Sequence, residues 1–279
     1  MTTVCLSFDF DALCSWITTF KQTSPTPLSR GEYGARVGVP RILELLRRHD
    51  VPATFFVPGH TALTFPTEVQ SIAAVGHEIA AHSFLHHSPV GQTREEELAD
   101  LVATEAALQK VVGVRPVGYR SPAWDLSPNT LNLLAERGYR YDSSLMADDF
   151  RVFMPRVGDR VADDGTVIFG DPCALIEFPV AWELDDFPYF QFVGRPPLLG
   201  LRSAAEVGAI WQAEFDYCAS SVTSGVFTLT MHPEVIGRGP RIEMLDSLIR
   251  HMKRRTGVAF ARMDDAATNA VPGTSAVIR

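Results

Sequence analysis

The sequence has little that would suit a membrane, a nucleic acid or secretion. No apolar run reaches the roughly 18 residues of a spanning helix. Residues 1–8 have neither the basic stretch nor the apolar run of a secretory signal. The formal net charge is −8 at pH 7, so we expect neither nucleic acid nor an anionic membrane as a partner. These features together predict a cytoplasmic protein.

Cysteine is also scarce. The four cysteines lie far apart and form no C-x-x-C pair. This spacing disfavours both a disulfide framework and a zinc knuckle, so we expect reduced thiols that lie mostly in the core. The chain has no internal repeat and no low-complexity segment.

Strand and helix patterns alternate along most of the 279 residues. With 46% hydrophobic and 21% charged side chains, the chain can bury one large core. Expected strands cover residues 3–8, 53–57, 78–81, 116–119, 139–141, 226–231 and 258–261. Expected helices cover residues 37–49, 66–75, 94–112, 127–137, 203–221 and 241–255, and the third begins with a Thr93/Glu96 capping box. Strands that are each followed by a helix favour a (β/α) barrel or a doubly wound sheet.

Three segments depart from this alternation. Residues 12–36 are too long for a routine connection, so we expect them to cover the site or to form a subunit contact. Residues 150–200, approximately, combine short β pieces, a turn at Asp164-Gly165 and the aromatic, acidic run W-E-L-D-D-F-P-Y-F-Q-F. We interpret them as an insertion in a single domain spanning residues 1–268. Residues 269–279 are expected to be a frayed tail.

Chemically active side chains follow the expected strands. Both candidate architectures place the active site at the carboxyl ends of strands. Five strands end next to such residues, namely Asp9 and Asp11, His82 and His86, Arg120, Asp142, and His232. We therefore expect these side chains to converge on one face.

The two aspartates after the first strand and the two histidines after the third predict a metal site. His82 and His86 are four residues apart in H-S-F-L-H, and on one helical turn their side chains would lie about 5–6 Å apart, near enough to bind one ion. Asp9 and Asp11 in S-F-D-F-D alternate with phenylalanines, so both carboxylates point the same way along a strand. Such close negative charges require a cation or a shared proton. Asp11, His82 and His86 as ligands would leave positions open for water and substrate.

The remaining residues suit hydrolysis of an amide. Asp9 is then free to act as the general base on a water molecule, and His232 as the acid that protonates the leaving nitrogen. Arg120 would hold Asp9 in its ionised form, and Asp142 is the candidate that orients His232.

The motifs S-F-D-F-D, H-S-F-L-H, R-S-P-A-W, Y-D-S-S and L-T-M-H-P occur in this order between residue 4 and about residue 265. The series resembles the polysaccharide deacetylase family, also called carbohydrate esterase family 4 or NodB-like. The resemblance implies a distorted (β/α) barrel of six or seven strands and the same residue roles as above. Phe10 separates the two aspartates that are adjacent in most members, which is similar to the branch with cytoplasmic peptidoglycan-deacetylase-like, allantoinase-like and cyclic-imide-hydrolase-like proteins. The expected substrate is therefore an N-acetylated sugar or peptidoglycan-like glycan, with a small cyclic amide or imide as the alternative.

Metal identity and substrate contacts are less constrained by the motifs. Two histidines and an aspartate favour Zn²⁺, and Co²⁺, Mn²⁺ or Fe²⁺ would also fit. Candidate substrate contacts are Trp124, Trp182, Asp186 and Arg238, against the alternatives of core aromatics, a solvated acidic pair and a surface arginine. The aromatic insertion suggests a homo-oligomer.

Two other classes of function share part of this pattern. A non-haem iron oxygenase also uses two histidines and a carboxylate. Asp9 and His232 argue against it, because hydrolysis needs a base and an acid and oxygen activation does not. An inactive binding module is expected to lack a base, a ligand or an acid, and this sequence has all of them.

Overall fold

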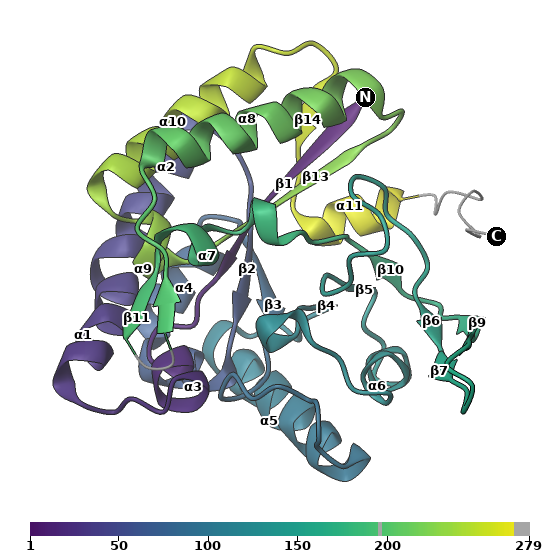
Figure 1. The fold of residues 1–279 in the computed structure, drawn as a ribbon. Coiled ribbons are helices and arrows are strands. Elements are labelled where there is room, and N and C mark those ends of the chain that lie inside the picture. Colours follow the sequence, from purple (N-terminus) through teal and green to yellow (C-terminus); the bar gives the residue numbers. More distant parts are fainter. Residues whose placement is uncertain (195–196, 271–279) are drawn as a thin grey trace.

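A curled parallel sheet forms the centre of the molecule (Figure 1). The computed structural model describes residues 1–194 and 197–270. The hydrogen-bonded path runs β10-β5-β4-β3-β2-β1-β13, and β14 pairs with β1 off this path. These strands are β1 Thr2–Asp9, β2 Thr54–Val57, β3 Glu78–Ala81, β4 Gly118–Tyr119, β5 Tyr141–Asp142, β10 Ile176–Glu177, β13 Val226–Met231 and β14 Val258–Phe260. All neighbours along the path are parallel, which confirms the distorted, barrel-like α/β fold.

β1 lies at the centre of the core. Seven of its eight residues are buried, and it pairs with β13 on one side and with β2 and β14 on the other. A strand covered on both faces reads as a near-continuous apolar run, as T-V-C-L-S-F does here.

The sheet does not close into a complete barrel. Among the described residues, the β10 and β13 edges are not paired with each other. The chain after β10 crosses the gap and meets β13 through one isolated parallel bridge, between Asp185 and Thr230. We call this gap, together with residues 178–190 that cross it, the seam.

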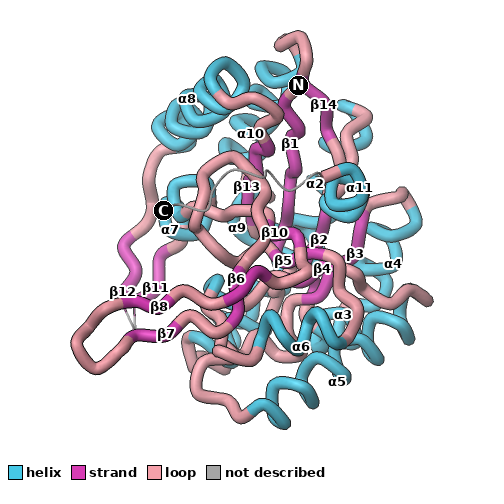
Figure 2. The backbone as a smooth tube through the Cα atoms, turned by 90° about the vertical axis from the view of Figure 1, so that its right-hand side faces the viewer, coloured by secondary structure: helices cyan, strands magenta, loops and turns pink. Residues whose placement is uncertain are grey.

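Helices pack around the outside of the sheet (Figure 2). The longer ones are α2 Val39–His49, α4 Pro66–Ala74, α5 Arg94–Val112, α6 Thr130–Glu136, α8 Ala204–Ser221 and α10 Gly239–Lys253. The capping box of α5 is present, and α5 ends at Gly113 with φ +74°. α6 begins later than predicted, because the Ser127 hydroxyl accepts a hydrogen bond from the Asn129 N–H and holds a turn there.

Residues 12–36 are mostly helical and not one long loop. They form the π-helical turn η1 (Ser15–Thr19), helix α1 (Pro25–Tyr33) and most of a second π-helical turn, η2 (Gly34–Gly38), which leads into α2. Gly38 lets η2 pack closely against Pro233, because an added Cβ would be 2.2 Å from the Pro233 carbonyl oxygen. This packing holds the segment against the carboxyl end of the sheet.

The region predicted as an insertion contributes more to the fold than expected. Its outer part forms three short antiparallel pairs, of which the β7–β8 hairpin turns at Gly165 as predicted. β10, however, belongs to the main sheet, since it pairs with β5. The pairs are β6 Arg156–Val157 with β9 Asp171–Pro172, β7 Arg160–Val161 with β8 Val167–Ile168, and β11 Phe192–Gly194 with β12 Pro197–Leu199.

Several short helices were not predicted. They are α3 Gly59–Thr64, η3 Pro122–Trp124, η4 Trp182–Leu184, α7 Asp186–Phe190, α9 Pro233–Ile236 and α11 Met263–Asn269. Most of the expected tail, residues 271–279, lies outside the described residues. Among the residues that are described, no helix combines the length and apolar character needed to cross a bilayer.

Candidate metal centre

Asp11, His82 and His86 meet at the carboxyl end of the sheet. Asp11 follows β1, and both histidines follow β3. His82 Nε2 lies 3.4 Å from Asp11 Oδ1, and His86 Nε2 lies 3.3 Å from Asp11 Oδ2. One nitrogen or oxygen atom of each residue lies within 4.8 Å of the others, and all three side chains are buried. This is the predicted set of ligands.

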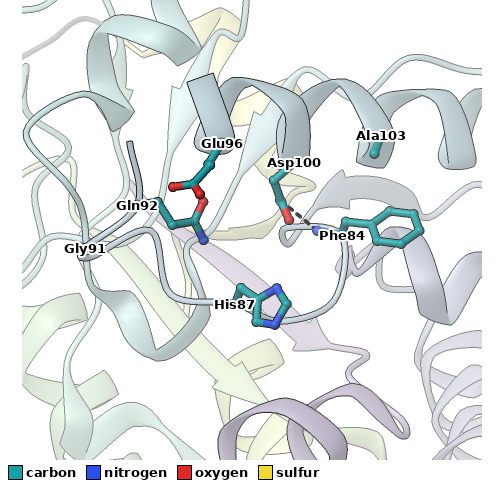
Figure 3. Close-up of a pocket in the computed structure, with 7 residues that line it drawn as sticks. All are labelled: Phe84, His87, Gly91, Gln92, Glu96, Asp100 and Ala103. Carbon is teal, nitrogen blue, oxygen red and sulfur yellow. Dashed lines mark hydrogen bonds between the residues drawn. The ribbon is translucent and has the colours of Figure 1, made fainter. Parts of the chain in front are cut away.

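The histidines reach this position on a turn, which corrects the predicted helical geometry. Ser83 and His86 have φ values of +53° and +57°, which an α-helix does not contain. The Asp100 carboxylate on α5 accepts a hydrogen bond of 2.8 Å from the Phe84 N–H and ties this turn to the helix (Figure 3). His87 lines a separate cavity of about 420 Å³ beside α5 (Figure 3), and neither His82 nor His86 is among the residues that line it.

The hydrogen bonds of His82 show that the cluster suits a cation. Its Nδ1 lies 2.7 Å from the Arg120 carbonyl oxygen, which only accepts, so Nδ1 carries the hydrogen. Burial lowers the pKa of His82, and a neutral ring then points the bare lone pair of Nε2 at Asp11. Asp11 Oδ1 is buried, and no donor in the described part of the chain reaches it. A divalent ion between these atoms would satisfy both.

Thr19 supports the other histidine. Its hydroxyl lies 2.9 Å from His86 Nδ1, which leaves Nε2 directed at Asp11. Thr19, Ser15 and Phe20 all line the cavity beside the cluster, so the segment of residues 12–36 covers the site. The sequence did not reveal Thr19, because a single hydroxyl in a long connection has no pattern that marks it.

Asp9 is held by Arg120. The guanidinium is fully buried, and its Nη1 donates to Asp9 Oδ1 at 2.7 Å and to Ser7 Oγ at 2.9 Å. Its Nε donates to the Ser143 carbonyl oxygen and its Nη2 to the Ser143 hydroxyl. The guanidinium also stacks 4.1 Å from the centre of the Phe56 ring. The predicted contact between Arg120 and Asp9 is therefore present.

Asp186, and not Asp142, orients His232. Asp186 Oδ1 lies 2.7 Å from His232 Nδ1, and the same carboxylate accepts the His232 backbone N–H. The prediction that Asp186 contacts substrate is revised, because its carboxylate is fully buried behind His232. Asp142 instead accepts a hydrogen bond from the Ser144 hydroxyl. The sequence contained one indication of this role. Asp185 and Asp186 lie within an aromatic run, and such a run tends to be buried, so that its carboxylates need a partner inside the protein.

The charges around His232 favour its protonated form. Burial by itself would lower the pKa of this imidazole. The neighbouring Asp185 charge and the hydrogen bond and charge of Asp186 outweigh burial and hold the pKa well above its usual value. Asp185, Asp186 and His232 also lie within 4.8 Å of one another, but the short Asp186–His232 hydrogen bond already occupies Nδ1.

Aromatic side chains wall a cavity of about 160 Å³ that also contains Asp9, Asp11, His82, His86 and His232. Trp124 and Trp182 stack with ring centres 4.3 Å apart, and Phe20 stacks on Phe187 at 5.9 Å. Ala123 and Trp124 have φ values of +54° and +57°, a costly conformation that directs this turn toward the cavity.

Arg238, the fourth candidate substrate contact, lies elsewhere. Its guanidinium stacks 4.1 Å from the centre of the Tyr33 ring, and its Nε donates to the Glu234 carbonyl oxygen. It is not among the residues that line the 160 Å³ cavity.

Comparisons with known proteins agree with this geometry. A family model described as polysaccharide deacetylase matches residues 31–141. A peptidoglycan deacetylase of Helicobacter pylori is 33% identical over 276 residues, which cover 95% of this chain and 94% of that protein. The crystal structure of a putative polysaccharide deacetylase from Mycobacterium smegmatis superposes with a TM-score of 0.86 at 37% identity, covering 98% of this chain and 93% of that one. A structure of Puue allantoinase shares the fold, with a TM-score of 0.78, 21% identity and coverage of 96% and 89%.

Proposed function

The chain belongs to the polysaccharide deacetylase family, and from this premise we propose that it is a metal-dependent N-deacetylase of an N-acetylated sugar or peptidoglycan-like substrate. One observation carries the proposal. The buried Asp11–His82–His86 cluster shares its cavity with Asp9, held by Arg120, and with His232, held by Asp186.

Asp11, His82 and His86 would hold the divalent ion, and zinc is the ion we propose. When bound, it would polarise the substrate carbonyl and lower the pKa of a water molecule. The neutral His82 supports this assignment, as does Asp11 Oδ1, which has no donor within residues 1–194 and 197–270.

Protein side chains would carry out the proton transfers. Asp9 accepts one proton from the attacking water, and Arg120 keeps the carboxylate aligned through the 2.7 Å hydrogen bond. His232 donates one proton to the leaving nitrogen, and Asp186 fixes the tautomer that places this proton on Nε2. One base and one acid supply the two proton transfers that amide hydrolysis requires, so these pairs favour hydrolysis over an iron oxygenase.

The shape of the cavity supports a small acyl group beside a flat apolar face. A volume of about 160 Å³ is below the 300–1,000 Å³ typical of sites that enclose whole drug-sized ligands. An acetamido group would enter it while the rest of a glycan remains outside. The stacked Trp124 and Trp182 rings would contact the apolar face of a sugar.

The Phe20–Phe187 stack favours one alternative on the same site. These parallel rings line the same cavity and would also suit a small flat ring, as in a cyclic amide or imide. Base, acid and ligands would keep their roles, because the reacting carbonyl and leaving nitrogen are the same.

A hydrolysis panel tests both substrates. The zinc-loaded protein is assayed for acetate release from N-acetylglucosamine oligomers and peptidoglycan fragments, and for ring opening of hydantoin and succinimide. We expect acetate release that Asp9→Asn and His232→Gln reduce by about 10²–10⁴-fold. Ring opening without acetate release would favour the alternative. Activity that is unchanged in Asp9→Asn would refute the mechanism for either substrate.

A further inference from the structure

Two fully buried carboxyl groups lie side by side at the ends of β5 and β10. Asp142 at the end of β5 and Glu177 at the end of β10 are register partners on neighbouring parallel strands (Figures 1 and 2). Both carboxyl groups reach Ser144, because Asp142 Oδ1 accepts a hydrogen bond of 2.9 Å from its hydroxyl and Glu177 Oε1 accepts one of 2.8 Å from its backbone N–H. Nevertheless, no donor of the described residues reaches Asp142 Oδ2 or Glu177 Oε2. Two buried carboxyl groups on neighbouring strands that lack a donor for these oxygens favour a proton shared between them.

The surrounding charges agree with a shared proton. Arg120 is a cation whose charge acts on Asp142, but it is already paired with Asp9. Burial raises the pKa of Asp142 to about 6, and burial together with the Asp142 charge raises the pKa of Glu177 well above its usual value. Two buried like charges in contact titrate as one unit, so a single proton serves both.

The pair also holds a turn of the backbone. Glu177 Oε1 accepts hydrogen bonds of 2.8 Å from the N–H groups of both Ser144 and Leu145. Asp142 Oδ1 accepts a bond of 2.9 Å from the Ser144 hydroxyl, which in turn accepts one from the Ser121 N–H. Residues 143–145 are thus fixed from both strands.

This turn supplies two acceptors to Arg120. The Ser143 carbonyl oxygen accepts from Arg120 Nε at 3.1 Å, and the Ser143 hydroxyl accepts from Nη2 at 2.9 Å. The remaining terminal nitrogen, Nη1, donates to Asp9. The direction in which Arg120 presents Nη1 to Asp9 therefore depends on where the turn lies.

We propose that Asp142 and Glu177 share one proton, and that the pair fixes residues 143–145 and thereby aligns Arg120 with Asp9. Neither carboxyl group lines the cavity, so both are positioning residues. The sharing of the proton stands on the geometry alone, whereas the effect on catalysis rests on the proposed role of Asp9 as base.

Infrared difference spectra test the shared proton without any assay of activity. At neutral pH we expect a protonated carboxyl band in the wild type that is lost in both Glu177→Gln and Asp142→Asn, because either amide replaces the proton donor. Glu105→Gln is the matched control, since Glu105 is another buried carboxyl whose pKa Arg137 and Arg115 hold below its usual value, and this variant should keep the band. Identical spectra for the wild type and Glu177→Gln would overturn the shared proton.

Two variants at one position test the positioning. Glu177→Gln keeps the acceptor for both N–H groups and adds a donor toward Asp142, so kcat and KM should stay within about threefold of the wild type. Glu177→Leu removes all of these bonds, so kcat should fall about 10–100-fold while KM and metal content stay the same. Full activity of Glu177→Leu, or equal damage in Glu177→Gln, would overturn the positioning role.

Exchange of the Arg120 Nε–H, measured by NMR, reports the position of the guanidinium without the use of a substrate. We expect slow exchange in the wild type and Glu177→Gln and at least tenfold faster exchange in Glu177→Leu. Equal exchange in all three would overturn the role. If Glu177→Leu does not fold, Asp142→Ala takes its place. A protein that hydrolyses none of the substrates but shows these spectra would refute only the proposed function.

Discussion

Thr19→Val should weaken metal binding without disturbing the fold. Valine keeps the shape of threonine and removes the hydroxyl that lies 2.9 Å from His86 Nδ1. Losing the partner of a buried polar group costs about 1–3 kcal/mol. Mutation of a group that supports a metal ligand typically lowers affinity by about 10–100-fold, which corresponds to about 1.4–2.7 kcal/mol. The two ranges overlap, so we expect the Kd for zinc to rise by about 10–100-fold.

The adjacent Thr18 provides the control. Its hydroxyl is buried in the same π-helical turn and has no hydrogen-bond partner among the described residues, so Thr18→Val should leave the Kd unchanged. Both Kd values can be measured by competition with a chelator, and circular dichroism checks the fold. Equal Kd values for Thr19→Val and the wild type, or equal weakening by both substitutions, would refute the assignment of Thr19.

Three further predictions follow from other contacts. Asp186→Asn removes the charge and lowers the pKa of His232, so the loss of activity at high pH should begin roughly 1–3 pH units lower, and an unchanged basic limb of the pH–rate profile would contradict this. Removal of zinc by a chelator should lower Tm, since a ligand at 100 times its Kd stabilises by about 2.7 kcal/mol, and calorimetry that finds equal Tm values would argue against the site. Thr93→Ala removes the cap of α5, so the free energy of unfolding measured with urea should fall by about 1 kcal/mol while the Kd for zinc stays the same. A raised Kd would contradict the independence of the α5 cap and the zinc site.

The sequence predicted the parts of this protein that short-range patterns encode. β3 and β13 occur at the predicted residues, because buried strands between turn signals have a distinct composition. α5 begins at its predicted capping box, because that motif is also encoded within a few neighbouring residues. The metal cluster was also predictable, since the ends of parallel strands must share one edge. Its local geometry was not, because the left-handed residues Ser83 and His86 bend the chain in a way that spacing does not report.

Long-range partners were harder to predict. Asp186 and Asp142 were both plausible partners for His232. Only the path of residues 178–190 across the seam decides that Asp186 reaches it. Thr19 and Glu177 depend in the same way on tertiary packing. No periodicity or motif at these positions records which side chain they will meet.

Because the sheet does not close, the side chains of the site differ in how firmly the backbone that carries them is bound to the sheet. Asp9 ends β1, and the proposed metal ligands follow β1 and β3, which lie within a continuous hydrogen-bonded sheet. The carboxylate that contacts His232 is instead carried by a segment that, among the described residues, has one isolated β-bridge to β13. Regions with few backbone hydrogen bonds open at lower free energy than the core. We therefore expect mild heat or denaturant to displace Asp186 before the sheet opens, so that the proposed proton donor would be lost while the proposed zinc site stays intact.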